Sequence, residues 1–250
     1  MSVVEGAPVR RHVTPGVYNL RDTGGYRAAT GTSRWGKLFR SDALHLLDAA
    51  GRDLIADLGI AHIVDLRGDD ELRSAPSALD GVAVHVHHLP VFDQAAPASQ
   101  ADMRLGLAPI YDHMVDARGA QLADAVRVIA AAEDDEAVLV HCTAGKDRTG
   151  LVIAFALSAA GVDRDEVVAD YAQTAENLRG EWAERMLAGF RDGGAELTPE
   201  VIELVTASPA EVLDALLARV EREHGSVRAY LRANGLSAPD LDRLTAVLVD

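Results

Sequence analysis

The chain has 250 residues, of which 48% are apolar, and a formal net charge of −15 at pH 7. This length allows one or two domains, and the apolar fraction supports a large buried core rather than a disordered chain. Such acidity argues against a general nucleic-acid-binding protein, which would need a basic face. The single cysteine, Cys142, excludes an intramolecular disulfide framework and a multi-thiolate zinc site.

No targeting or membrane segment stands out. Residues 1–12 contain no apolar run long enough for a secretory signal, and the longest apolar stretch, 151–162, is shorter than the ~20 residues that span a bilayer. We therefore expect a cytoplasmic protein without an integral membrane segment, although leaderless secretion would leave no trace in the sequence.

Four short segments, rich in β-branched residues and bounded by Gly, Asp or Pro, are predicted strands: Lys37–Arg40, Ala61–Leu66, Val82–Pro90 and Ala137–His141. Helical patterns separate them. One begins after Asp48 and ends at Gly59, and another runs from Tyr111 to Ala132 with a break at Gly119. The pattern Thr149–Ala160 is apolar nearly all round, which indicates a core helix. This alternation predicts an α/β fold with a mostly parallel sheet covered on both faces.

After Gly161 only helical patterns remain. Plausible N-caps are Asp163, Thr198, Ser208 and Ser237, and Pro199 and Pro209 fit first helical positions. The predicted helices are Asp163–Thr174, Glu176–Phe190, Pro199–Thr206, Pro209–His224, Ser226–Asn234 and Ala238–Val249.

The segment 137–150 carries the chemistry, because it is predicted to run from a strand through a tight loop into the core helix. Five residues separate Cys142 from Arg148, and Gly145 lies between them. Backbone N–H groups of such a loop point into one concavity, and the helix that follows adds its positive dipole end. This anion-binding nest favours the thiolate of Cys142, which is the nucleophilic form.

The other loop residues fit phosphate chemistry. The planar guanidinium of Arg148 can bind two phosphoryl oxygens, and Thr149 can hydrogen-bond the sulfur so that it leaves more easily in a second step. His141 is expected to order the loop rather than act as a base. The predicted substrate-binding residues are Thr143, Ala144, Gly145, Lys146, Asp147 and Arg148.

This C-x5-R loop is that of the cysteine-dependent phosphatases, and the chain resembles the atypical bacterial protein tyrosine phosphatase family that includes mycobacterial protein tyrosine phosphatase B. The resemblance rests on the loop and on short segments in the same order: Tyr18–Asp22, Leu38–Ser41, Val64–Arg67, His88–Pro90 with Asp93, Asp163–Asp165, Ala169–Tyr171 and Tyr230–Arg232. It implies activity on phosphotyrosine, and also on phosphoserine, phosphothreonine and phosphoinositides.

The resemblance also implies one phosphatase domain over 1–250, with a parallel sheet and a helical lid. We expect an α/β catalytic core at 1–161, a lid at 162–207 and C-terminal helices at 208–250 that pack on the core.

Two aspartates compete to protonate the leaving oxygen. Asp93 opens a polar loop after a predicted strand, where the resemblance also places the family's aspartate. Asp147 lies inside the nest, as an acid, a water-positioner or an orienter of Lys146 and Arg148. We favour Asp93.

The predicted enzyme forms a phosphocysteine and needs no metal or cofactor; its partners are phosphorylated proteins or phosphoinositides. His85 and His87 share a strand face, but no third metal ligand is evident. Arg40 could contact substrate or pair with Asp42 or Asp65. The alternative function is a phosphate-binding pseudophosphatase, a docking module without turnover.

Overall fold

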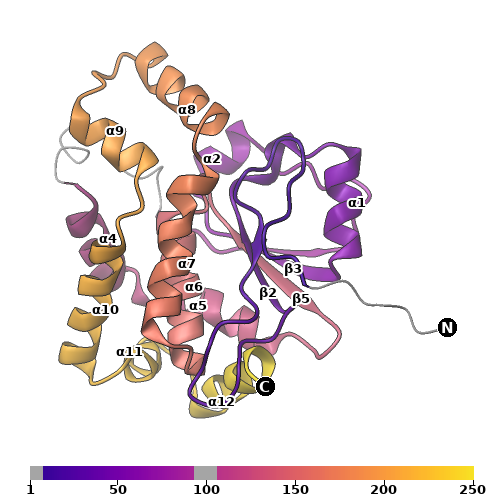
Figure 1. The fold of residues 1–250 in the computed structure, drawn as a ribbon, viewed down its shortest axis with the longest axis vertical. Helices are drawn as coiled ribbons and strands as arrows, with labels where there is room; N and C mark the ends of the chain where they lie inside the picture. The colour runs from indigo at the N-terminus through magenta and orange to yellow at the C-terminus, as the bar shows by residue number, and fades with distance from the viewer. Residues whose placement is uncertain (1–7, 93–105) are drawn as a thin grey trace.

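The computed structural model describes residues 8–92 and 106–250. A five-stranded sheet has the order β1-β2-β5-β3-β4 (Figure 1). The strands are β1 Arg21–Asp22, β2 Leu38–Ser41, β3 Ile60–Asp65, β4 His85–His88 and β5 Ala137–His141. The last four pair in parallel and β1 pairs antiparallel with β2. The predicted α/β class and mostly parallel sheet are therefore confirmed, and the antiparallel edge strand β1 is an addition.

Side chains of the central strand β5 alternate between two buried cores, as the period of a strand requires. Val138 and Val140 belong to the larger core, and Ala137 and Leu139 to the smaller one. The larger core is built against α4 (Leu107–Ala117), α5 (Gly119–Ala131) and α6 (Asp147–Ala160), and the smaller one against α1 (Ala49–Asp57). In Figure 1, α1 stands on one side of the sheet and α5 and α6 on the other.

The predicted helices of the first half agree with the structure. Asp48 caps α1, because its side chain accepts a hydrogen bond from the Gly51 N–H at 2.8 Å. The predicted break at Gly119 separates α4 from α5. Nearly every residue of α6 is buried, as its uniform apolarity indicates. The strand predicted over Val82–Pro90 is shorter, since only His85–His88 is paired.

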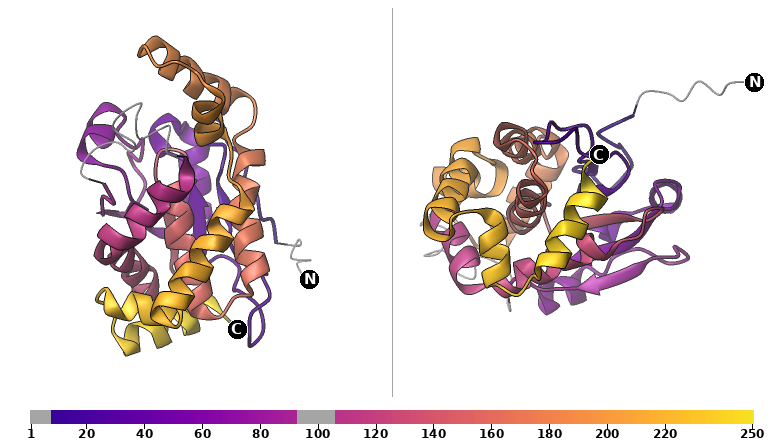
Figure 2. Two further views of the ribbon diagram at one scale, coloured as in Figure 1. Left: turned by 90° about the vertical axis from the view of Figure 1, so that its left-hand side faces the viewer. Right: turned by 90° about the horizontal axis from the view of Figure 1, so that it is seen from below.

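The C-terminal helices fall into two groups. Helices α7, α11 and α12 pack against α6, with α11 and α12 also against α5, and α10 packs against α7, α11 and α4. Helices α8 and α9 stand at the opposite end of the molecule from α12 (Figure 1 and Figure 2). Their bounds are α7 Arg164–Asn177, α8 Glu181–Asp192, α9 Pro199–Thr206, α10 Ala210–His224, α11 Val227–Ala233 and α12 Ala238–Leu248; the short α2 spans Asp69–Ser74 and a 3-10 turn Leu44–Leu46.

Thr198 and Ser237 cap their helices as predicted, and Asp163 is the predicted N-cap residue of α7, although its side chain makes no cap hydrogen bond. The N-cap prediction for Ser208 was wrong. Pro209 is the N-cap of α10, while the Ser208 hydroxyl bonds α7 instead, donating to the Ala172 carbonyl and accepting from the Ala175 N–H. A tertiary partner thus replaces the local cap at Ser208. Within the described ranges, no helix has the length and apolarity needed to span a membrane.

Candidate active site

The candidate site lies at the carboxyl edge of the parallel strands, where β5 ends at His141 and the chain turns through 142–146 into α6. Ligand sites of open α/β sheets lie at this edge. Here a cavity of about 340 Å³ is bounded by both Cys142 and Arg148. Cys142 is only 2% exposed. The predicted nucleophile and the predicted phosphate-binding guanidinium therefore line the same cavity.

The walls of this cavity are mostly apolar. Helices α8 and α9 contribute Trp182, Phe190 and Leu204, and the opposite side carries Phe92 and Ile110. Helix α7 instead packs along α6, with Val167 and Tyr171 buried. Within the segment 162–207, only α8 and α9 are placed to cover the cavity.

The loop can turn only because Gly145 has no side chain. Its φ is +64°, and a Cβ there would overlap the Ser41 carbonyl group. A left-handed backbone is costly for any residue with a Cβ, and here the close approach of β2 adds a steric barrier.

Arg148 forms a bidentate ion pair with Glu71, a residue that the sequence analysis missed. Nη1 and Nη2 donate to the two carboxylate oxygens at 2.6 and 2.9 Å, and the Thr143 hydroxyl donates to the same carboxylate. Burial alone would lower the pKa of Arg148, but the charges of Cys142 and Glu71 raise it above its ordinary value. Arg148 is thus a fixed cation, and Glu71 sets the plane of its guanidinium.

His141 is fully buried, as expected for a residue that orders the loop. Its Nδ1 lies 3.3 Å from the Cys142 carbonyl, and Nε2 lies 3.6 Å from Asp65. Burial lowers the pKa of His141, although Asp65 opposes the shift. Burial would raise the pKa of Asp65, but His141 and Arg67 outweigh it and hold the pKa below its ordinary value. Arg67 and Asp65 form a buried ion pair, with Nη2 at 2.6 Å from Oδ2.

Lys146 is buried in the loop, and its ammonium is already engaged. Nζ donates to the Leu204 carbonyl at the end of α9 and lies 3.7 Å from Asp147 Oδ1. The second cation of the nest therefore also links the loop to α9, a contact between residues far apart in the chain that no local pattern predicts.

Asp147 accepts a hydrogen bond from Tyr111, whose hydroxyl in turn contacts that of Tyr171. The Tyr111 hydroxyl donates to Asp147 Oδ1 at 2.7 Å and lies 2.6 Å from the Tyr171 hydroxyl. Burial is the main cause that raises the pKa of Tyr111, and the Asp147 charge raises it further. The Tyr111 hydroxyl therefore stays protonated and remains a donor. Asp147 lines the cavity with a carboxylate whose orientation is set by Tyr111.

Three further predictions have different outcomes. Thr149 Oγ1 is buried without a hydrogen-bond partner in the described part of the chain, so the expected bond to the sulfur is not formed. Arg40 pairs with Asp170 at 2.5 Å rather than with Asp42 or Asp65. Asp93 lies outside the described residues, although Phe92 directly before it lines the cavity.

Histidines 85 and 87 meet a third histidine at the sheet edge. His62 Nδ1 lies 3.1 Å from His87 Nε2, and its ring stacks on that of His85. Across residues 8–92 and 106–250, no three metal-ligating side chains are arranged to hold an ion.

Comparison with known proteins identifies the family of the chain. The tyrosine phosphatase family matches residues 12–250. The chain is 34% identical over 277 residues to triple specificity protein phosphatase PtpB of Mycobacterium tuberculosis, which covers 94% of this chain and 98% of that protein. It is 30% identical over 213 residues to a tyrosine-protein phosphatase of Nostoc commune, which covers 82% of this chain and 71% of that protein.

The chain therefore belongs to the tyrosine phosphatase family. It is a protein-tyrosine phosphatase, as the resemblance noted in the sequence predicts. Among solved structures, P. aeruginosa TpbA matches with a TM-score of 0.39 and 21% identity, over 78% of this chain and 95% of that one.

We expect Gly145→Ala to displace the loop and lower kcat for p-nitrophenyl phosphate by about 10²-fold, the loss typical of one misplaced oxyanion donor. Gly59→Ala is the matched control, because Gly59 has a φ of +66° but no heavy atom within 4 Å of the Cβ position. It should cost stability without lowering kcat. Equal kcat values for the two variants would contradict the steric argument.

The buried carboxyl group of Asp42 predicts how the stability of the fold changes with pH. Its side chain is buried beneath the loop and accepts the N–H groups of Tyr18 and Asn19 at 3.0 and 2.9 Å. Burial raises the pKa of Asp42 to about 6. The folded state then binds the proton more tightly than the unfolded state, so this group's contribution to stability is present at low pH and is lost as pH rises through 6.

We therefore expect the unfolding free energy of Asp42→Asn to rise relative to wild type by roughly 2 kcal/mol from pH 4 to pH 7. Urea unfolding across this range measures it. Asp53→Asn, on the exposed side of α1, should follow the wild-type profile. A constant difference between Asp42→Asn and wild type would show that Asp42 does not titrate in this range.

Proposed function

We propose that this protein hydrolyses phosphotyrosine through a phosphocysteine intermediate, without a metal. One observation carries the proposal: Cys142 and Arg148 line the same cavity, at the two ends of a glycine-containing loop that leads into the N-terminus of α6. The loop N–H groups and Arg148 would stabilise the three outer oxygens of a loose transition state.

The reaction proceeds in two steps. The Cys142 thiolate attacks phosphorus, an S–P bond forms and the P–O ester bond breaks, and the leaving oxygen takes a proton from the general acid. The resulting carboxylate then takes a proton from water as that water attacks phosphorus. The S–P bond breaks, and inorganic phosphate and the thiolate are released.

We assign the general acid to Asp93 rather than to Asp147. Phe92 brings the chain to the cavity at the position directly before Asp93. Asp147 receives a hydrogen bond from Tyr111, which stays protonated, and lies 3.7 Å from the Lys146 ammonium. A carboxylate engaged in this way suits the orientation of Lys146 better than the delivery of a proton.

The apolar walls favour an aromatic leaving group. Trp182 and Phe190 on one side and Phe92 on the other suit the ring of phosphotyrosine. Phosphoserine, phosphothreonine and phosphoinositides are further candidate substrates. Lys146, freed from the Leu204 carbonyl, supplies an additional cation for a densely charged headgroup.

Cys142→Ser tests the nucleophile. We expect wild type to hydrolyse p-nitrophenyl phosphate and phosphotyrosine peptides, and the variant to lose kcat by about 10⁴-fold or more, as enzymes do when they lose their nucleophile. Phosphoserine peptides and phosphoinositide vesicles complete the panel and rank the substrates. A wild-type protein that binds phosphotyrosine peptide without turnover would instead be a pseudophosphatase docking module.

Asp93→Asn and Asp147→Asn separate the two acid candidates. Alkyl phosphates need protonation of a poor leaving group, whereas p-nitrophenol leaves with little help. We expect Asp93→Asn to lower kcat for an alkyl phosphate by about 10²–10³-fold and to affect p-nitrophenyl phosphate less. Unchanged alkyl phosphate turnover in Asp93→Asn, with loss in Asp147→Asn, would move the role to Asp147.

A further inference from the structure

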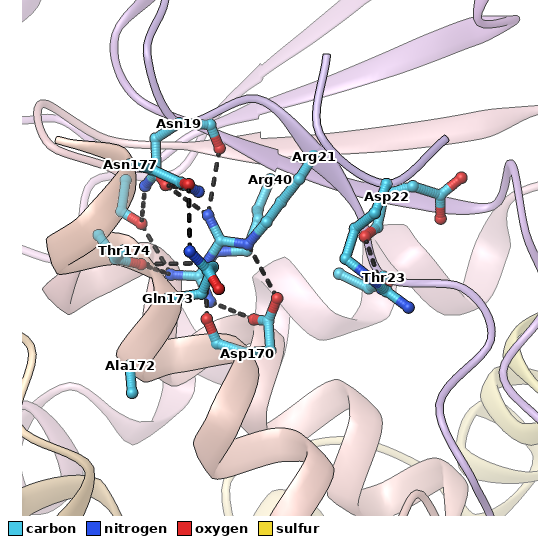
Figure 3. A network of polar contacts seen from close by, with 12 residues as sticks. Asn19, Arg21, Asp22, Thr23, Arg40, Asp170, Ala172, Gln173, Thr174 and Asn177 are labelled. Carbon is cyan, nitrogen blue, oxygen red and sulfur yellow. Dashed lines mark hydrogen bonds and ion pairs between the residues drawn. The ribbon is translucent and has the colours of Figure 1, made fainter. Parts of the chain in front are cut away.

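A buried polar network lies directly behind the loop. This Arg40–Asp170 network comprises four side chains: Asn19, Arg21 of β1, Arg40 of β2 and Asp170 of α7. Figure 3 shows Arg21 and Arg40 pointing from the sheet side toward Asp170. All four side chains are at most 3% exposed. A set of charges this deeply buried is expensive unless it is closely paired.

The network ends on two carbonyl groups of the loop. Asn19 Nδ2 donates to the Ala144 and Gly145 carbonyls at 3.2 and 3.1 Å. Arg40 Nη2 donates to the Gly145 carbonyl at 2.7 Å, while its Nη1 binds Asp170 at 2.5 Å. The donors therefore approach the loop from the side opposite the cavity.

A trans peptide points its carbonyl and the following N–H in opposite directions. When the Ala144 and Gly145 carbonyls are held backward, the N–H groups of Gly145 and Lys146 must point forward, toward the cavity. Those are the two central donors of the anion nest. Peptide orientation in this loop is thus set by side chains that never reach the substrate.

The charges of the network act in the same direction. Two guanidinium groups, of Arg21 and Arg40, share one carboxylate, and the third polar partner of Asp170 is the neutral Tyr26 hydroxyl. Burial lowers the pKa of Arg21 most, and the neighbouring Arg40 charge lowers it further, whereas the two guanidinium groups overcome burial to lower the pKa of Asp170. Arg21 and Asp170 therefore both stay charged near neutral pH. Within the network two guanidinium groups face one carboxylate, although the Asp42 carboxylate beneath the loop adds a negative charge above pH 6. The Arg40 guanidinium that contacts the Gly145 carbonyl polarises that peptide and favours an anion in front.

We infer that Asn19 and Arg40 are positioning residues for phosphoryl transfer: they fix the Ala144 and Gly145 carbonyls and thereby aim the Gly145 and Lys146 N–H groups at the transferring phosphoryl group. Arg21 and Asp170 hold these two residues in place. The inference rests on the proposed function, because it assigns the cavity to a phosphoryl group.

Asn19→Asp separates positioning from simple stabilisation. The substitution keeps an oxygen for the two donors that Asn19 Oδ1 accepts, Arg21 Nη1 and Asn177 Nδ2. It removes the Nδ2 donor and places an oxygen opposite the two loop carbonyls. Folding contacts are therefore largely retained while the peptide orientation is lost.

Ser208→Ala is the matched control. The Ser208 hydroxyl makes two buried hydrogen bonds to α7, the helix that carries Asp170, but none to the network or the loop. Its loss should destabilise the fold without reaching the site. Urea unfolding gives the stability of each variant.

We expect Asn19→Asp to lower kcat for p-nitrophenyl phosphate by about 10²-fold and Ser208→Ala to keep it within about threefold of wild type. The inhibition constant of orthovanadate, which mimics the transition state, should rise in Asn19→Asp in parallel with the loss of kcat/KM. That of inorganic phosphate should rise less, because preorganised donors bind the transition state best.

A folded Asn19→Asp variant with kcat within threefold of wild type would overturn the inference. Equal losses of kcat in Asn19→Asp and Ser208→Ala would also overturn it. If Asn19→Asp fails to fold, Arg40→Lys decides, because a single ammonium cannot bridge Asp170 and the Gly145 carbonyl as the guanidinium does. Wild-type kcat in a folded Arg40→Lys would also overturn it. Absence of turnover in wild type would instead refute the proposed function, and vanadate binding by calorimetry would still test the positioning role.

Discussion

The orientation of the peptides in the loop between β5 and α6 is the constraint on which the site depends. An anion nest requires consecutive N–H groups to point inward, so the carbonyls must point outward and still find donors. Gly145 permits the turn with a φ of +64°, and Asn19 and Arg40 supply the donors. The close approach of β2 to the loop and the burial of Arg40 behind it belong to this arrangement.

Most of the fold and the core of the site could be predicted from the sequence, because their signals are local. Cys142, Gly145 and Arg148 lie within one uninterrupted segment, and strand and helix periods predict the sheet and α6 around it. The signal is equally local for the Asp48, Thr198 and Ser237 caps, where the acceptor and the N–H group are three residues apart. Most of the predictions that succeeded concern groups that are neighbours in the chain.

Predictions failed where a distant partner competes with the local one. Glu71 is 77 residues from Arg148, and Asp170 is 130 residues from Arg40, so no spacing rule connects either pair. Ser208 illustrates the competition directly: its hydroxyl bonds the backbone of α7 instead of capping the next helix. Lys146 likewise reaches the Leu204 carbonyl of α9, because both groups are buried together at the wall of the cavity.

The acidic composition becomes compatible with an anionic substrate once burial is considered. Surface charges are screened by salt over about 8 Å, so most of the net charge of −15 acts weakly at the cavity. The cations of the site are instead buried: Arg40 is 0% exposed, Lys146 1% and Arg148 6%. Charges in a low-dielectric interior act with much less screening. A protein that repels polyanions at long range can therefore still bind a single phosphoryl group strongly at close range. Its specificity for that group comes from the positions of the buried cations rather than from the number of cations in the protein.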